Sequence, residues 1–304
     1  MSKVQVTKLH TFAGHRDCVY TLQPGSKPNL FFSGGGDGMV VQWDLQQLGD
    51  GELIAKLNSS IYSLLHIADK KILIVGENYS GIHLIDYENK KELASLQLTT
   101  SAIFDVQHFE NDLIIATGDG LLTIVDLEKW EVKKRIATSE KSARTIAINE
   151  KTGEMAVGFS DHCIRIFSLR DFELKQEIKA HTNSIFALSY SPDGKLLLSG
   201  ARDAKLKAWD VLSSYTQTEE VAAHLYAINH LTFAPDGKHF ATCSMDKSIK
   251  VWRADDLQLL KVIDKGRHAG HGTSVNKLLW TSYNNQLISA SDDRTISVWD
   301  LLFL

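Results

Sequence analysis

The sequence is poor in cysteine. Only Cys18, Cys163 and Cys243 occur in 304 residues, and no two of them form a CxxC pair. An odd number of cysteines at irregular spacing indicates neither a disulfide framework nor a zinc site built on thiolates. Unpaired thiols are typical of proteins in a reducing compartment, so we expect a cytoplasmic location.

The sequence also lacks a strong excess of charge of either sign. Lys and Arg together number 33 and Asp and Glu 37, which gives a formal net charge of −4. Proteins that bind nucleic acid or an anionic membrane surface usually carry a basic excess or a basic patch. We therefore expect neither nucleic acid nor membrane as a partner.

Long apolar runs are absent as well. No stretch of 18 or more apolar residues occurs, and the first residues, MSKVQVTKLHTF, contain no apolar segment followed by a small-residue cleavage site. The sequence therefore predicts neither a membrane-spanning helix nor a secretion signal. Hydrophobic residues nevertheless make up 43% of the chain, which is enough to bury a large core and excludes a disordered or fibrous protein.

What the sequence does contain is an internal repeat. A tryptophan or another apolar side chain ends a strand-like stretch at seven positions: Trp43, Ile85, Val125, Phe167, Trp209, Trp252 and Trp299. The intervals between these positions run from 40 to 47 residues. Seven such units cover nearly the whole chain, so we expect residues 1–304 to form one domain rather than the two that length alone suggests.

A set of polar residues accompanies the tryptophans. An Asp stands six residues before the closing position in every unit except the second, where Tyr79 replaces it. In the first, fifth, sixth and seventh units, a His precedes that Asp by 22 residues and a Ser or Thr precedes the Trp by ten. The four complete sets are His15, Ser33, Asp37 and Trp43; His181, Ser199, Asp203 and Trp209; His224, Thr242, Asp246 and Trp252; and His271, Ser289, Asp293 and Trp299.

Each unit also contains short stretches of alternating apolar residues bounded by turn residues, such as SIFALSY, SPDG and KLLLSG in the fifth unit. This pattern predicts four β-strands per unit. With the period and the recurring His, Asp and Trp, the sequence resembles the WD-repeat (WD40-type) family. The resemblance implies an all-β fold, a seven-bladed β-propeller of four-stranded antiparallel blades, in which each complete polar set forms a hydrogen-bonded structural tetrad.

The two ends of the sequence complement each other. The last unit stops shortly after Trp299, before a fourth strand could follow. Residues 4–12, VQVTKLHTF, precede Gly14-His15 as similar alternating segments precede the later units. We therefore expect this N-terminal strand to complete the last blade and close the ring, which removes exposed sheet edges. On this interpretation no residues remain for a second domain or a targeting tail.

The His, Ser and Asp of each complete unit have the composition of a hydrolase triad. The same trio recurs four times with a Trp attached, which an active site does not require. The sequence contains no GxSxG, P-loop or HExxH motif. We therefore predict no enzyme activity and no catalytic, cofactor-binding or metal-binding residues, and we interpret His268 and His271 as part of a basic surface loop, residues 265–272.

In the WD-repeat family, partners often bind the top face of the propeller, through residues at the start of each inner strand and residues that precede the turn Asp. By this resemblance, the partner-binding residues are Tyr20, Tyr62, Phe104, Arg144, Phe186, Arg202, Asn229, Met245 and Asn276. Aromatic and Arg side chains are enriched in recognition surfaces and here favour an acidic, partly apolar protein or peptide. The sequence therefore predicts an interaction scaffold that is monomeric by itself.

Two other functions stay open at this point. A small-ligand or catalytic site at the mouth of the channel would require clustered acids or metal ligands there. A reader of phosphorylated motifs would require Arg144 and Arg202 to converge within one pocket.

Overall fold

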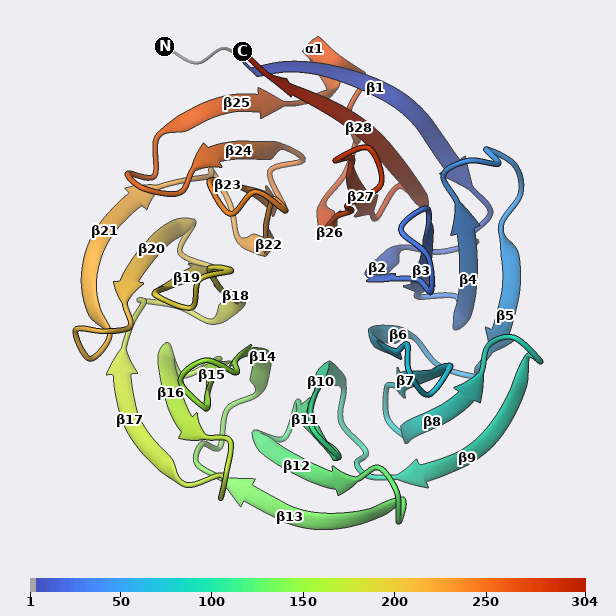
Figure 1. The fold of residues 1–304 in the computed structure, drawn as a ribbon, viewed down its shortest axis with the longest axis vertical. Helices are drawn as coiled ribbons and strands as arrows, with labels where there is room; N and C mark the ends of the chain where they lie inside the picture. The colour runs from blue at the N-terminus through green and yellow to red at the C-terminus, as the bar shows by residue number, and fades with distance from the viewer. Residues whose placement is uncertain (1–3) are drawn as a thin grey trace.

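The computed structural model describes residues 4–304 and shows seven four-stranded antiparallel sheets arranged in a ring (Figure 1). Each sheet is one blade, and its first strand lies nearest the centre of the ring. The predicted fold, a seven-bladed β-propeller closed by the N-terminal strand, is confirmed.

The strands are assigned to the blades as follows. Blade 1 contains β2 (Val19–Pro24), β3 (Leu30–Gly35), β4 (Met39–Asp44) and β5 (Glu52–Lys56); blade 2 contains β6 (Ile61–Ile67), β7 (Ile72–Glu77), β8 (Gly81–Asp86) and β9 (Lys91–Gln97). Blade 3 contains β10 (Ile103–Phe109), β11 (Asp112–Thr117), β12 (Leu121–Asp126) and β13 (Glu131–Ala137); blade 4 contains β14 (Ala143–Asn149), β15 (Glu154–Phe159), β16 (Cys163–Ser168) and β17 (Leu174–Lys179). Blade 5 contains β18 (Ile185–Tyr190), β19 (Leu196–Ala201), β20 (Lys205–Asp210) and β21 (Thr216–Ala222); blade 6 contains β22 (Ile228–Phe233), β23 (His239–Ser244), β24 (Ile249–Arg253) and β25 (Leu259–Ile263). Blade 7 contains β26 (Val275–Trp280), β27 (Leu287–Ser291), β28 (Thr295–Phe303) and β1 (Val4–Ala13).

The core lies between the blades. Second strands such as β19, LLLSGA, are almost entirely buried because both of their faces pack against other sheets. Fourth strands such as β13, EVKKRIA, instead alternate exposed and half-buried residues because only one face is covered. Apolar clusters combine residues of consecutive blades, as where Phe32 of β3 packs with Ile61 of β6 and Leu73 of β7.

The antiparallel order gives the ring two distinct faces. The start of each first strand and the turn between the second and third strands lie on one face, which we call the top face. The connections from first to second strand and from third to fourth strand lie on the opposite, bottom face. The turn aspartates and the predicted partner-binding residues therefore belong to the top face.

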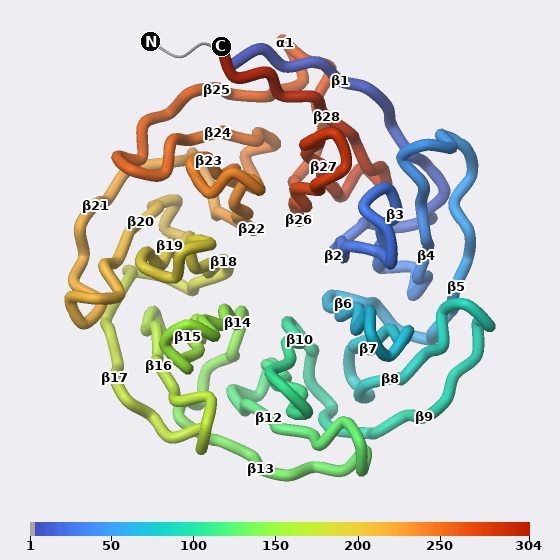
Figure 2. The backbone as a smooth tube through the Cα atoms, in the orientation of Figure 1, coloured from blue at the N-terminus to red at the C-terminus, as the bar shows by residue number. Residues whose placement is uncertain are grey.

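Pairing of β1 with β28 closes the ring. The register runs from Val4 opposite Phe303 to Ala13 opposite Thr295, with one irregularity near Lys8. Phe12 of β1 is buried and packs against Phe31 of β3 and Trp43 of β4, with ring centroids 5.8 and 5.1 Å away. The two paired strands run side by side along the outside of the ring (Figure 2). This segment therefore links blade 7 to blade 1 through apolar contacts as well as backbone hydrogen bonds.

The segment predicted as a basic surface loop contains a single helical turn, α1 (Lys265–His268). The Asp264 side chain accepts a hydrogen bond from the Arg267 backbone N–H and so caps this turn. α1 lies on the outer side of the ring, beyond β28 (Figure 1). The helical turn that contains Lys265 and Arg267 therefore lies away from the centre of the ring. Within the described chain, no helix is long and apolar enough to cross a membrane.

Removing residues 1–12 is expected to lower the melting temperature by about 5 °C or more, because it removes the buried Phe12 and most of the pairing with β28. Removing residues 1–3 alone leaves β1 intact and serves as the control. Thermal unfolding followed by circular dichroism measures both variants, and an unchanged melting temperature after the longer deletion would contradict the role of β1.

Candidate functional site

One backbone irregularity recurs in all seven blades at the top of the first strand. The pairing of first and second strands skips one residue in each blade, which is the mark of a β-bulge. The skipped residues are Tyr20, Tyr62, Phe104, Arg144, Phe186, Asn229 and Asn276. A bulge re-aims a side chain away from the regular pleat. We call these seven residues the rim; all of them are half-buried and all belong to the predicted partner-binding set.

Five rim residues from consecutive blades form one continuous chain of ring contacts. The rings of Tyr20 and Tyr62 meet edge to face at 4.6 Å, and those of Tyr62 and Phe104 stack at 5.9 Å between centroids. The Arg144 guanidinium lies 4.0 Å from the centroid of Phe104 and 5.4 Å from that of Phe186. The structure therefore brings these five predicted residues together as an arc that spans blades 1 to 5.

Arg144 carries a positive charge that no carboxylate neutralises. Its Nε donates a hydrogen bond to Ser160 Oγ at 2.9 Å, and within residues 4–304 it forms no ion pair. Burial lowers the pKa of Arg144, Tyr62 opposes this, and the positive charge of Arg202 lowers it further. Arg202 thus acts on the same region of the top face.

The other predicted residues play different parts. Asn229 donates to Ser274 Oγ and to the Val275 carbonyl, at 3.0 and 2.8 Å, and so ties blade 6 to blade 7. Asn276 donates to the Val19 carbonyl at 3.0 Å and ties blade 7 to blade 1. Arg202 and Met245 are exposed on neighbouring turns. The two asparagines are therefore engaged within the protein, whereas Arg202 and Met245 are free to meet a partner.

Cys18 and Asp292 also belong to this region. By the family resemblance Asp292, like Arg202 and Met245, was expected among the residues that precede a turn Asp, whereas nothing in the sequence pattern pointed to Cys18. The Cys18 thiol donates to the Asp292 carbonyl at 3.7 Å, and burial together with the Asp292 charge raises the pKa of Cys18 to about 11. The thiol therefore stays protonated near neutral pH and is not a nucleophile. Asp292 directly precedes the turn Asp293, and this position is the signal by which the family resemblance identified it.

The polar sets of blades 1, 5, 6 and 7 form hydrogen-bonded chains. In blade 5, Trp209 Nε1 lies 2.9 Å from Ser199 Oγ, which lies 2.8 Å from His181 Nε2. His181 Nδ1 lies 3.1 Å from the Asp203 carboxylate. With the indole and Nδ1 as donors, the hydroxyl donates to Nε2, and each buried group is satisfied. The corresponding atoms of the other three sets lie 2.7 to 3.1 Å apart.

Blades 2, 3 and 4 use other polar contacts in the same place. In blade 2, Glu77 accepts from the backbone N–H groups of Asn58 and Ser59 and contacts His83 Nε2 at 3.1 Å. In blade 4, Ser139 occupies the position of the missing His and donates to Asp161 at 2.6 Å. Asp119 of blade 3 likewise accepts from Thr99, at 2.8 Å. The sequence pattern missed Glu77, Ser139 and Thr99 because their residue types differ from those of the complete set. Some of their spacings differ from it as well.

The buried serines and histidines of these sets cannot act on a substrate. Ser33, Ser199 and Ser289 have no exposed surface, and their hydroxyls are already bound to an indole and an imidazole. Among residues 4–304, no group of three or more His, Cys, Asp and Glu side chains is arranged to hold a metal ion. The geometry of the complete sets is that of structural networks inside each blade.

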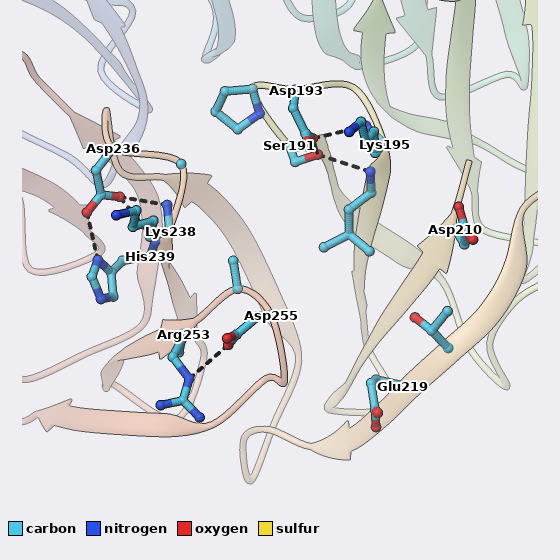
Figure 3. Close-up of a pocket in the computed structure, with 15 residues that line it drawn as sticks. Ser191, Asp193, Lys195, Asp210, Glu219, Asp236, Lys238, His239, Arg253 and Asp255 are labelled. Atoms are coloured by element: carbon cyan, nitrogen blue, oxygen red, sulfur yellow. Dashed lines mark hydrogen bonds and ion pairs between the residues drawn. The ribbon is translucent and has the colours of Figure 1, made fainter. Parts of the chain in front are cut away.

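A pocket of about 870 Å³ lies on the bottom face, between blades 5 and 6 (Figure 3). Several of its charged side chains are paired with one another. Arg253 contacts Asp255 at 2.8 Å, and His239 contacts Asp236 at 2.7 Å. A second hollow, of about 560 Å³, opens on the same face at the centre of the ring. Neither pocket includes any of the rim residues.

Comparison with protein families supports the assignment of the repeats. The family model described as "WD domain, G-beta repeat" matches residues 6–44, 172–210, 215–253 and 263–300, which together make up about half of the chain. These matches coincide with the four units that carry a complete polar set. The three units without a complete set remain unmatched by that model.

Individual relatives are distant. The chain is 24% identical to a striatin homolog of Dictyostelium discoideum over 69% of its length, and 24% identical to meiotic fizzy-related protein 1 of Schizosaccharomyces pombe over 71%. An uncharacterized WD repeat-containing protein of Schizosaccharomyces pombe is 24% identical over 97% of the chain. The chain covers 30%, 53% and 48% of these proteins respectively, so it spans about half or less of their lengths.

Replacing Ser199 by Ala is expected to lower the free energy of unfolding by about 2–4 kcal/mol, because the change leaves the buried His181 and Trp209 nitrogens without their shared partner. Ser282→Ala, an exposed change on the bottom face, is the control and should have an effect below about 0.5 kcal/mol. Urea unfolding measures both. Equal stability of the two variants would show that the network contributes little.

The unfolding free energy is also expected to decrease as the pH falls below 6.5. Burial lowers the pKa of His15 and His224 from 6.5, although Asp37 and Asp246 oppose this, so the folded protein favours neutral rings and the unfolded chain binds more protons. Burial alone would raise the pKa of Asp37, but the Arg16 and Met39 N–H groups and His15 outweigh it and lower that pKa from 3.8. A second decrease therefore begins below pH 3.8.

Urea unfolding between pH 7.5 and pH 3 tests this dependence. In the double variant His15→Gln, His224→Gln the decrease that begins near pH 6.5 should be smaller than in the unchanged protein, because two of the titrating groups are gone. A constant unfolding free energy from pH 7.5 to 5 would contradict the expectation.

Proposed function

Because this chain belongs to the WD40 repeat family, we propose that it is a non-catalytic interaction scaffold that binds a peptide segment or a partner subunit on its top face. The observation that carries the proposal is the arc Tyr20, Tyr62, Phe104, Arg144 and Phe186, which five consecutive blades supply from equivalent bulges. A rigid scaffold that presents aromatic and Arg side chains has the composition of a recognition surface.

The charge of the arc indicates the kind of partner. Arg144 lies between two phenylalanines without a carboxylate, and Arg202 is close enough to lower its pKa, after the larger effect of burial. A partner that is acidic and partly apolar would supply the missing carboxylate and cover the rings.

In this proposal residues 1–304 act as one propeller domain that is monomeric by itself. Its location is the cytoplasm, where its three free cysteines remain reduced.

A second candidate function uses the same two arginines. A segment carrying a phosphorylated residue would also match Arg144 and Arg202, since paired guanidinium groups bind phosphate oxygens in a bidentate manner. The observation that favours it is that both guanidinium groups belong to the top face of neighbouring blades, Arg144 in β14 and Arg202 just after β19, where the charge of Arg202 lowers the pKa of Arg144. Comparing a captured segment with and without its phosphate separates the two: phosphate-dependent binding would favour the reader, and phosphate-independent binding the scaffold.

The double variant Tyr62→Ala, Phe104→Ala is expected to lose the proteins that the unchanged chain captures from native cell extract, because it interrupts the arc in the middle. Leu212→Ala, which removes a side chain 71% exposed on the bottom face, is the matched control. Quantitative mass spectrometry compares the three captures, with melting temperatures measured to show that the variants are folded. A captured set that is the same for all three proteins would place binding on another surface.

A further inference from the structure

The side of the rim opposite Arg144 carries charge of the other sign. Asp292 accepts a hydrogen bond from Asn276 Nδ2 at 2.7 Å, and Asp17 accepts one from the Cys18 backbone N–H at 2.7 Å. Within residues 4–304, neither carboxylate forms an ion pair, although Arg16 and Arg294 stand close by in the sequence. Asp17 is exposed and Asp292 is half-buried. Blades 7 and 1 therefore present two unneutralised carboxylates to the top face.

These carboxylates act on the aromatic arc. Burial, the Cys18 thiol and Tyr62 raise the pKa of Tyr20, and the charge of Asp292 raises it further. Burial likewise raises the pKa of Tyr62, which Arg144 lowers and Asp17 raises. Tyr62 is thus influenced by a positive charge from blade 4 and by a negative charge from blade 1. The electrostatic potential therefore rises along the arc, from the side of Asp17 and Asp292 to the guanidinium beside Phe104.

The arrangement of the blades separates the two charged regions. The first strands β14 and β18 lie across the centre of the ring from β2 and β26, and β6 and β10 lie along the arc between them (Figure 1). Arg144 belongs to β14, Arg202 follows β19 of blade 5, and Asp17 and Asp292 lie next to β2 and β27. Tyr62 and Phe104 occupy the positions between the basic and the acidic regions.

We propose that the rim binds a peptide segment in one orientation, with a carboxylate on Arg144 and Arg202, an apolar or aromatic side chain on Tyr62 and Phe104, and a Lys or Arg on Asp17 and Asp292. This inference rests on the proposed function and adds the charge pattern of the partner. The uniformly acidic segment favoured by the arginines alone would be repelled by the two carboxylates. A segment with both charges at a matching separation satisfies both regions, and reversing its orientation would bring like charges together.

The test uses a random peptide library displayed on phage and selected on the whole protein. Enriched peptides are then synthesised with a fluorescent label, and their affinities are measured by anisotropy for the unchanged protein and for Arg144→Gln and Asp17→Asn. Arg170→Gln and Asp69→Asn, exposed charges on the bottom face, are the matched controls. Melting temperatures show whether each variant is folded. Arg144 is half-buried, so its replacement could also change the packing of its neighbours, whereas Asp17 is exposed and its replacement tests charge alone.

Enriched peptides are expected to carry an acid and a base on opposite sides of an apolar residue. Arg144→Gln should weaken their binding by about tenfold, Asp17→Asn severalfold, and the bottom-face controls less than twofold. Replacing the acid of the peptide by Gln should remove the effect of Arg144→Gln alone, and replacing its base should remove the effect of Asp17→Asn alone.

Three outcomes distinguish a failure of the charge pattern from a failure of the proposed function. Enriched peptides whose affinities fall with the double variant Tyr62→Ala, Phe104→Ala but change less than twofold with both Arg144→Gln and Asp17→Asn would overturn the charge pattern and leave the proposed function standing. Peptides that couple to Arg144 and carry no base would also overturn it, since the acidic region would then take no part. Peptides that bind the Tyr62→Ala, Phe104→Ala variant as well as the unchanged protein would overturn the proposed function itself.

Discussion

Pairing between β1 and β28 joins residues near the two ends of the chain, and the positions of all seven blades depend on it. Each blade buries its apolar faces only against its neighbours, so a ring opened at one junction would expose two apolar faces and two strand edges. The packing of Phe12 against Phe31 and Trp43 makes this junction a part of the core rather than a backbone contact alone.

Closure also gives the rim its arrangement. A single bulge directs one side chain, whereas seven bulges on a closed ring bring seven side chains to one end of the molecule. The stacking of Tyr62 on Phe104 and of Phe104 under Arg144 crosses three blades, so these contacts exist only when the blades keep their spacing. The polar networks within the blades stabilise the same face, because they connect the loop before the first strand to the turn Asp, or in blade 2 to Glu77.

Much of this architecture could be predicted from the sequence because the repeat is local. A His, a Ser or Thr, an Asp and a Trp at constant offsets lie in one blade, and the register of two hairpins is enough to bring them together. The residues at the start of each first strand could be located through the resemblance to the WD-repeat family, but the bulge that each of them occupies came from the structure. The residues that replace the complete set in blades 2 to 4 could not be predicted in this way. In blade 2, for example, Glu77 accepts hydrogen bonds from the backbone N–H groups of Asn58 and Ser59, and its spacing matches no other unit.

The sequence by itself determined the number of repeat units, from a period of about 42 residues, and indicated the strand that closes the ring, from its alternating apolar side chains. The rim residues were located through the resemblance of these units to the WD-repeat family. Only the tertiary structure decided which rim residues touch and which charges remain unpaired. Arg144 and Asp292 are 148 residues apart in the chain, and nothing in either unit reveals that they lie on opposite sides of one aromatic arc. The physical reason is that ring closure, and not local hydrogen bonding, sets the distances between side chains of different blades.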